Sequence, residues 1–351
     1  MDKKTLQKID IKDKKILFEL SLNPRASFSE ISKRVKLPVG TISYRINTLK
    51  KKGIYNGAYI DVNPKVFGYR KYIILIKFKG TSDLQKRGYI ENVKSISNII
   101  SIMECGGKWD SIFTIITQTL DELYDCLCEI KNKLKPNIID FVLNPVLNEK
   151  FIHFGFFRNE KHDTYILDRL REKDKNYINK LTKINHKLIN KINIDKIDIE
   201  IITELEQDAS ISIARLSYKI GLSYNAISNR MKRLHQMNVF TSIFPLIKNI
   251  PLGLEWHNLF LDIDFPDEKK EKEFLTYIIT HPYIMYYMKL IGTYNYKITI
   301  LSKNTMHLNE ILIDIRNRFA DYIEEYESIL VFHYHYSIFI TDIIKKEESF
   351  K

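Results

Sequence analysis

The chain has 351 residues, 44% of them hydrophobic, which is enough for two or more domains with cores of their own. Its formal net charge of +12 favours a polyanionic partner, either nucleic acid or an anionic membrane surface. No apolar run reaches the roughly 18 residues of a membrane-spanning helix, and the charged stretch MDKKTLQKIDIKDKK lacks the apolar segment of a signal peptide. We therefore expect a cytoplasmic protein without a membrane partner.

Residues 13–54 show the pattern of three short helices. Apolar residues recur at helical spacing in the first, Ser27 and Glu30 form a capping box at the start of the second, and Gly53 ends the third. The apolar residues of the third helix fall on one face, at Ile42, Ile46 and Leu49. This order is typical of a helix-turn-helix unit, whose last helix enters the major groove of DNA.

The remaining face of that third helix is polar and basic. An arginine can bind a guanine edge or pair with a phosphate, and lysines suit the phosphate backbone. The alternative is a basic, solvated helix face without DNA, which is common for a single helix. We predict DNA contacts from six residues: Thr41, Ser43, Tyr44, Arg45, Asn47 and Lys50.

The next module alternates strands and helices. The stretch YRKYIILIKFK is rich in isoleucine and aromatic residues and predicts a strand. The segments that follow complete the order βαββαβ, which is the ferredoxin-like pattern. The predicted ranges are strand 69–79, helix 83–95, strand 97–105, strand 110–117, helix 120–134 and strand 138–146.

Both modules recur later in the chain. Sliding the sequence by 185 residues brings 13–54 onto 198–239 without a gap, and eleven positions are identical, among them Ser43/Ser228 and Arg45/Arg230. The same offset places Gly107 on Gly292. The second helix-turn-helix therefore predicts its own DNA contacts: Tyr224, Asn225, Ser228, Asn229, Arg230, Lys232 and Arg233.

The fold class that follows is α+β, with four domains and a linker. We expect two winged-type helix-turn-helix domains at 1–62 and 194–247, and two ferredoxin-like domains at 63–156 and 248–351. Residues 157–193 are strongly charged, lack glycine and proline, and have apolar residues near helical spacing. They predict a charged helical linker.

The stretch IDIKDKKILFELSLNPRASFSEISKRVKLPVGTISYRINTLKKKGIYNG, residues 9–57, resembles the DNA-binding domain of the Lrp/AsnC family of bacterial and archaeal regulators. Residues 194–240 match that domain more loosely. Two departures affect the ends of the third helix. Pro38 replaces a polar cap that Ser223 keeps in the second copy, and Asn238 replaces the closing glycine.

The resemblance implies that the βαββαβ modules are sensor domains that pair into dimers and larger rings and bind small effectors such as amino acids. The family signature in these modules is Gly-Asp-aromatic-Asp. Here it reads Gly107-Lys108-Trp109-Asp110 and Gly292-Thr293-Tyr294-Asn295. A carboxylate there would hold an amino group, so Asp110 is a better candidate than Asn295. The alternative is a tight hairpin that binds no ligand.

A tandem chain could build by itself the two-headed arrangement that dimers of this family present to DNA. We predict that the two sensor domains pair within one chain or crosswise with a second chain, so that the protein is a pseudo-dimer or a higher homo-oligomer. The two recognition helices differ in sequence. The preferred DNA site should therefore be an imperfect palindrome.

Two other functions remain open. Chains of this type also serve as sirohaem decarboxylases, for which the candidate residues would be His153, His281, His333 and His335, although they form no convincing constellation. The other is a regulator that only tunes partner proteins and binds DNA weakly by itself. His333 and His335 share one strand face but lack a third ligand nearby, so we expect no metal, no cofactor and no catalytic residue.

Overall fold

We describe a computed structural model, which covers residues 6–80, 82–157, 194–336 and 339–349. The expected helical linker lies outside these residues apart from Phe157. Among the described residues, no helix combines the length and apolar character needed to span a membrane.

Two helix-turn-helix units form as the sequence predicts. We call residues 9–54 head 1 and residues 194–239 head 2. Ser27 caps its helix through the predicted capping box with Glu30, and Asn238 adopts the left-handed conformation that Gly53 adopts in head 1. The helices are α1 (Ile11–Leu22), α2 (Phe28–Val35) and α3 (Val39–Lys51) in head 1, and α8 (Lys196–Gln207), α9 (Ile213–Ile220) and α10 (Tyr224–Gln236) in head 2.

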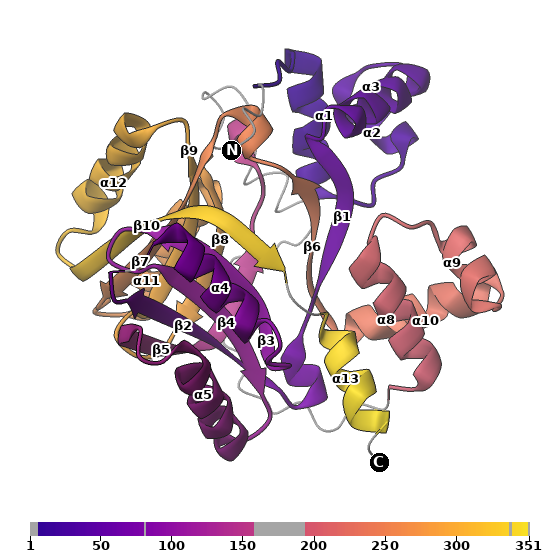
Figure 1. Cartoon of the computed structure of the whole chain (residues 1–351). Coiled ribbons are helices and arrows are strands. Elements are labelled where there is room, and N and C mark those ends of the chain that lie inside the picture. The colour runs from indigo at the N-terminus through magenta and orange to yellow at the C-terminus, as the bar shows by residue number, and fades with distance from the viewer. Residues whose placement is uncertain (1–5, 81, 158–193, 337–338, 350–351) are drawn as a thin grey trace.

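Each head continues into a strand, and these two strands pair with each other. β1 (Tyr55–Val62) and β6 (Phe240–Ile247) form an antiparallel ribbon between the heads (Figure 1). The register pairs Tyr55 with Ile247 and Val62 with Phe240. The offset of 185 exchanges these two pairs, so the ribbon has a local pseudo-two-fold axis. Sequence analysis did not predict these strands as a pair, because each partner lies in the other copy.

The two βαββαβ modules also form in the predicted order. The strand β5 is longer than the range 138–146 that periodicity predicts. The first module contains β2 (Arg70–Phe78), α4 (Asp83–Val93), β3 (Ile99–Gly106), β4 (Ser111–Thr117), α5 (Leu120–Leu134) and β5 (Ile138–Phe151). The second contains β7 (Glu255–Ile263), α11 (Glu268–Thr280), β8 (Ile284–Leu290), β9 (Tyr296–Ser302), α12 (Thr305–Phe319) and β10 (Ile323–Tyr336).

The two modules join into one closed barrel with the strand order β10-β3-β4-β2-β5-β8-β9-β7. The outer half of β5 pairs with β8 of the other copy, and β10 pairs with β3, which explains the extra length of β5. The prediction that the two modules pair within one chain is therefore the arrangement observed. Closure removes both free sheet edges, and the four module helices cover the outside (Figure 1).

Short elements tie the heads to the barrel. The 3-10 turns are η1 (Pro64–Phe67), η2 (Gly155–Phe157) and η3 (Ile250–Leu252), and the chain ends in α13 (Ile340–Ser349). α13 lies beside α8 of head 2 (Figure 1), where Glu206 accepts hydrogen bonds from the backbone of Ile340 and Thr341. Phe154 and Phe157 pack into the core of head 1. Each head therefore has apolar contacts that hold it against the rest of the molecule.

The barrel interior contains an apolar cluster and, beside it, a group of buried charged side chains. Lys71 and Glu149 form a buried ion pair, and the Tyr286 hydroxyl donates to Glu149 at 2.7 Å. Burial alone would lower the pKa of Lys71, but the adjacent Glu149 holds it above its usual value. Lys297 is also buried, and desolvation lowers its pKa to about 8. These charged groups come from both copies.

The positions equivalent to that ion pair carry different chemistry in the other copy. The offset maps Lys71 onto Trp256 and Glu149 onto Tyr334, and the two aromatic rings stack with centroids 5.8 Å apart. The barrel therefore has a pseudo-two-fold backbone and an asymmetric interior.

Candidate nucleic-acid interface and sensor loops

The recognition helix of head 1 presents its polar face to solvent. Ile42, Ile46 and Leu49 are buried in the core of the head, as their spacing predicts. The Tyr44 side chain is 72% exposed, and Asn47 and Lys50 are also exposed. Thr41 and Ser43 are half-buried at the N-terminal end of the helix. Five of the six predicted contact residues in head 1 therefore lie where DNA could reach them without rearrangement of the helix.

The recognition helix of head 2 has the same design and a better N-terminal cap. The Ser223 hydroxyl accepts a hydrogen bond from the Ala226 amide at 3.2 Å, whereas Pro38 provides no side-chain cap for α3. The predicted contact residues on its outer face are exposed or half-buried: Tyr224, Asn225, Ser228, Asn229 and Lys232.

Arg45 and Arg230, the arginines shared by both copies, are held inside their own heads. Arg45 Nη1 lies 2.7 Å from Asp10 Oδ2 and 2.8 Å from Asp13 Oδ1, at the N-terminus of α1. Arg230 makes the same pair of contacts with Asp195 and Asp198 at 2.7 and 2.8 Å. These guanidiniums clamp the first helix to the third in each head. Their repetition in the sequence is thus explained by folding.

The clamp also has an electrostatic signature. Hydrogen bonds to the two carboxylates raise the pKa of Arg45 and of Arg230. In head 2, Arg233 adds a further contact to the buried Asp198, while Thr48 occupies the equivalent place in head 1. Arg233 can still face a phosphate, because its side chain is 44% exposed.

The two heads differ strongly in charge. Head 1 contains eleven lysines and arginines and four aspartates and glutamates, a net charge of +7. Head 2 contains six of each and is neutral. In head 1, Lys50, Lys51 and Lys52 follow one another at the end of α3, and Lys52 donates to the Lys8 carbonyl at 2.9 Å. Attraction to phosphates is therefore concentrated on head 1.

The aromatic residues of the two predicted sensor loops point into the barrel. Trp109 and Tyr294 are 2% and 0% exposed and belong to an apolar cluster with residues of both modules inside the barrel. Gly107 and Gly292 both have φ of 122°, which a side chain would strain. Each loop packs on the last strand of the other copy, since Lys108 lies 3.8 Å from Glu325 and the Tyr294 amide faces Asn144 Oδ1 at 3.4 Å.

The acidic position of the signature makes the same internal bond in both copies. Asp110 Oδ2 accepts from the Phe78 amide at 2.9 Å, and Asn295 Oδ1 accepts from the Ile263 amide at 3.0 Å. Asp110 also pairs with Lys86 at 2.6 Å. This carboxylate therefore already has partners that complete the turn after the first strand. Lys108 and Thr293 are the loop side chains that remain exposed.

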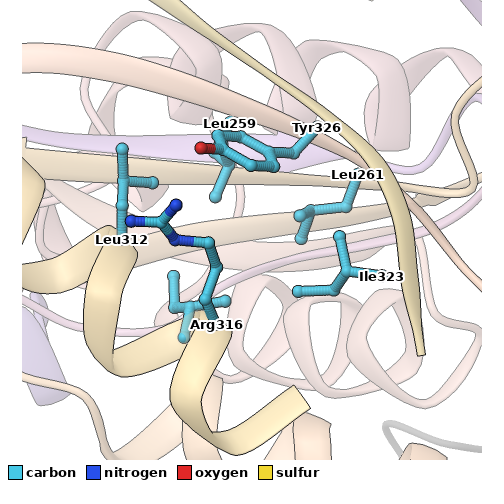
Figure 2. A pocket seen from close by; sticks show the side chains of 7 residues that line it. Leu259, Leu261, Leu312, Arg316, Ile323 and Tyr326 are labelled. Atoms are coloured by element: carbon cyan, nitrogen blue, oxygen red, sulfur yellow. The ribbon is translucent and has the colours of Figure 1, made fainter. Parts of the chain in front are cut away.

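Two small apolar crevices lie between a helix and the sheet, at equivalent places in the two copies. Figure 2 shows the second, with the Arg316 side chain from α12 near Tyr326 and with Leu259, Leu261 and Ile323 behind them. Its counterpart in the first copy lies under Lys131 and Phe141, and the space that water could occupy is about 0 Å³ in the second copy and about 10 Å³ in the first. In both, a cation covers an aromatic ring, at 6.0 and 4.3 Å from its centroid. We interpret both crevices as small packing gaps between a helix and the sheet, and not as ligand sites.

The four histidines considered for an enzyme are divided between two places. His153 is buried beside Phe18 of head 1, His281 is half-buried, and desolvation lowers the pKa of each to about 4. His333 and His335 lie on β10, with His335 3.8 Å from Glu104. Among the described residues, no group of three or more metal-ligating side chains is placed to hold a metal ion.

Comparison with known proteins places the heads in recognised families. A winged helix-turn-helix DNA-binding model matches residues 9–54, and an AsnC-type helix-turn-helix model matches residues 194–235. An HTH-type transcriptional regulator of Methanocaldococcus jannaschii is 29% identical over 121 residues, 34% of this chain and 80% of that protein. The regulatory protein AsnC of Escherichia coli K12 is 28% identical over 120 residues, 34% of this chain and 78% of that protein.

The whole chain also has a structural counterpart. The crystal structure of the siroheme decarboxylase NirDL superposes with a TM-score of 0.58, covering 96% of this chain and 98% of that one, at 12% identity. That likeness establishes a shared fold. The relatives found by sequence are about half as long as this chain, which contains two copies of the same unit. One helix-turn-helix model matches each copy. The chain therefore carries two helix-turn-helix units, one in each copy, and is similar in sequence to AsnC-type transcriptional regulators.

Proposed function

We propose that the protein is a sequence-specific DNA-binding transcriptional regulator whose single chain supplies both DNA-binding heads. The observation that carries the proposal is the β1–β6 ribbon, which sets two exposed recognition helices about one pseudo-two-fold axis. Two heads so related suit two half-sites about one helical turn of DNA apart, or a multiple of it. The curated relatives are transcriptional regulators, which supports the same reading.

The test is a titration of the full chain with fragments of its own upstream region at several salt concentrations. We expect tight, sequence-preferring binding that weakens steeply with salt, with a slope of roughly 0.9 for each phosphate neutralised. Binding that is absent, or weak and insensitive to sequence, would contradict the proposal and favour the partner-only regulator.

The two heads should prefer an imperfect palindrome. Tyr44, Asn47 and Thr48 of α3 stand where α10 carries Asn229, Lys232 and Arg233. Different side chains at equivalent places read different base edges. Selection from a random DNA pool should yield two unlike half-sites, and recovery of a symmetric palindrome as the tightest site would contradict this expectation.

An effector, if one binds, would act through the barrel. The candidate residues remain Gly107 to Asp110 and Gly292 to Asn295, and among their side chains only those of Lys108 and Thr293 are exposed to solvent. An amino acid that shifts the melting temperature of the unmodified chain but not of a Lys108→Ala chain would support a site at the first loop. Equal shifts in both chains would place the site elsewhere.

The enzyme reading is the second candidate, because the siroheme decarboxylase fold covers nearly the whole chain. We propose that this chain is not such an enzyme, since its candidate histidines do not converge on one cleft and its heads carry exposed recognition helices. Addition of sirohaem followed by absorbance spectroscopy tests this. A stoichiometric spectral shift, with loss of carboxyl groups from the tetrapyrrole, would overturn it.

A further inference from the structure

The two heads touch directly through one side chain, Arg25. It lies in the short loop between α1 and α2, and its guanidinium crosses to head 2. Arg25 Nη1 donates to the Ala209 carbonyl at 2.9 Å, and Nη2 donates to the Ile211 carbonyl at 3.0 Å. Both acceptors belong to the loop between α8 and α9. A planar guanidinium with two fixed donors holds such a pair of carbonyls in one relative orientation.

Arg25 is half-buried where it crosses between the heads. Desolvation lowers the pKa of Arg25, and the nearby Asp208 opposes that effect. Asp208 is itself fixed, because its Oδ1 accepts hydrogen bonds from both the amide and the hydroxyl of Ser210. A charge-assisted contact that is shielded from water is stronger than an exposed ion pair.

This joint has no counterpart related by the pseudo-two-fold axis. The offset of 185 places Ser210 where head 1 has Arg25, and a serine cannot reach across to the other head. It also places Ala209 where head 1 has Pro24. The Ala209 amide donates to the Ala58 carbonyl of β1 at 2.9 Å, and a proline has no amide hydrogen for an equivalent bond to β6.

The two heads are therefore anchored by different means. Head 2 is bonded to the ribbon through Ala209, and its Asp208 lies against Gly57, where a Cβ would come within 3.2 Å of the carboxylate. Head 1 lacks that backbone bond and is instead tied to head 2 by Arg25. The loop of head 2 thus serves both as an anchor on β1 and as the acceptor for head 1.

We propose that Arg25 is a positioning residue that fixes the separation and orientation of α3 relative to α10, and thereby the spacing of the half-sites that the chain can bind at once. The inference about DNA rests on the proposed function. The inference about the heads themselves does not, because their relative position can be measured without DNA. The two parts are tested separately on the full chain.

The first test measures the distance between the heads. Spin labels are attached at Tyr44→Cys and Tyr218→Cys, positions that are 72% and 89% exposed, in a Cys128→Ser background that leaves the buried Cys105 and Cys126 in place. Double electron–electron resonance should give one narrow distance distribution for the parent. We expect a broader distribution for Arg25→Ser, which installs the residue of head 2, and for Arg25→Lys, whose flexible ammonium lacks the fixed fork of a guanidinium.

The matched control is Arg87→Ser, which removes the same charge from the exposed face of α4 and should leave the distribution narrow. Circular dichroism of all variants separates a released joint from a head that has unfolded. A distribution for folded Arg25→Ser as narrow as that of the parent would overturn the proposal.

The second test measures binding to a series of DNA duplexes in which the two half-sites are moved apart one base pair at a time. Loss of simultaneous engagement typically costs 10²–10⁴ in affinity, so we expect the parent to prefer its best spacing over one shifted by half a turn by about a hundredfold. In Arg25→Ser this preference should fall to about tenfold or less. Arg87→Ser should keep the parental ratio.

The outcomes distinguish failure of the inference from failure of the proposed function. If the parent does not bind DNA specifically, the proposed function fails, and the distance measurement alone decides whether Arg25 holds the heads. If the parent binds with a spacing preference that Arg25→Ser keeps, the positioning role in DNA recognition is wrong whatever the distances show.

Discussion

Heads 1 and 2 share three helices, the arginine clamp and the left-handed residue after the third helix, yet they differ in net charge by seven units. Head 1 has the basic run Lys50-Lys51-Lys52 and an uncapped recognition helix, while head 2 has the capped helix and compensating acidic residues. From this comparison we propose a division of labour, in which head 1 supplies most of the attraction to the DNA backbone and head 2 supplies contacts that depend more on the bases.

The two halves of the barrel also differ, in the buried polar side chains that each contributes. The first module contributes the Lys71–Glu149 pair, and the second contributes Tyr286 and Lys297 around it. The offset of 185 maps Tyr286 onto Ser101 and Lys297 onto Ile112. A barrel made from two first modules would therefore have a serine and an isoleucine near Glu149 in place of the tyrosine and the lysine. A barrel made from two second modules would leave Lys297 without that carboxylate. The two halves are therefore complementary to each other.

The largest expected effect comes from breaking that complementarity. Glu149→Ala leaves the buried Lys71 with only the more distant Asp61, at 3.9 Å, and removes a carboxylate that stabilises the charge of Lys297, so we expect a loss of about 3 kcal/mol in the free energy of unfolding. Urea denaturation followed by circular dichroism measures it. The double variant Lys71→Met/Glu149→Leu removes both charges and should cost clearly less. A single-variant loss no greater than that of the double variant would show that the pair is not coupled.

The second prediction concerns the charge difference between the heads. Replacing Lys50, Lys51 and Lys52 by alanine should weaken DNA binding by about a hundredfold at 0.15 M salt and lower the salt slope by two to three, roughly one for each phosphate that is no longer neutralised. Lys232→Ala, on the recognition helix of the neutral head, should lower the slope by about one. Fluorescence anisotropy at several salt concentrations measures both. If each lysine removed from either head lowered the DNA affinity by a similar factor, the proposed division of labour would be wrong.

The third prediction uses a buried carboxyl that only head 2 possesses. Burial raises the pKa of Glu206 to about 7, although Thr341 and the backbone of Ile340 donate hydrogen bonds to it, and head 1 has Ser21 at this place. The unfolded chain releases this proton near its usual pKa of 4.5, so the stability contributed by Glu206 falls as pH rises from about 4.5 to 7. Glu206→Gln should remove that fall, which is about 3 kcal/mol at 1.36 kcal/mol for each pKa unit.

The experiment compares the pH dependence of the free energy of unfolding for the parent and for Glu206→Gln. The buried His153 and the half-buried His281, with pKa values lowered to about 4, add stability that is lost as pH falls from 6.5 towards 4. Their contribution is common to both chains and cancels in the difference between the two curves. A difference that does not change between pH 5 and 8 would show that Glu206 is ionised throughout.

The smallest expected effects concern the helix caps. Ser223→Ala should cost head 2 about 1 kcal/mol, because the Ala226 amide loses its acceptor. Pro38→Ser should stabilise α3 by a few tenths of a kcal/mol to about 1 kcal/mol, since it introduces the cap that head 2 already has. Thermal unfolding of the full chain measures both changes. We expect the stability changes of the two variants to have opposite signs. A loss of stability in Pro38→Ser would show that the fixed φ of the proline contributes more than a serine cap.

Periodicity predicted the parts of this fold whose partners are near in sequence. The three helices of each head and the βαββαβ order follow from apolar spacing within windows of a few turns or strands. The β1–β6 ribbon was not predicted as a pair, because Tyr55 meets Ile247 across nearly two hundred residues and no hairpin turn joins them. For the same reason the second half of β5 was missed, since it pairs with β8.

The candidate site was predicted less completely than the fold. Tyr44 and Lys50 are exposed, as a polar helix face predicts. Arg45 was predicted to contact DNA, and the structure pairs it with Asp10 and Asp13, as it pairs Arg230 with their equivalents. The signal that could have shown this is the Asp-x-x-Asp spacing before each first helix. Lys71 and Glu149 look like surface residues in the sequence, and only closure of the barrel buries them.

Closure of the barrel by two unlike halves has an evolutionary consequence. In a dimer of identical subunits, every substitution near the shared interface appears twice, so a new buried lysine brings a second buried lysine with it. Once both halves are encoded in one chain, a mutation changes one half alone, and a compensating carboxylate can arise in the other. After gene duplication and fusion, the two sides of this interface no longer need to have the same sequence. Each half can then specialise at positions that are identical in the two subunits of a homodimer.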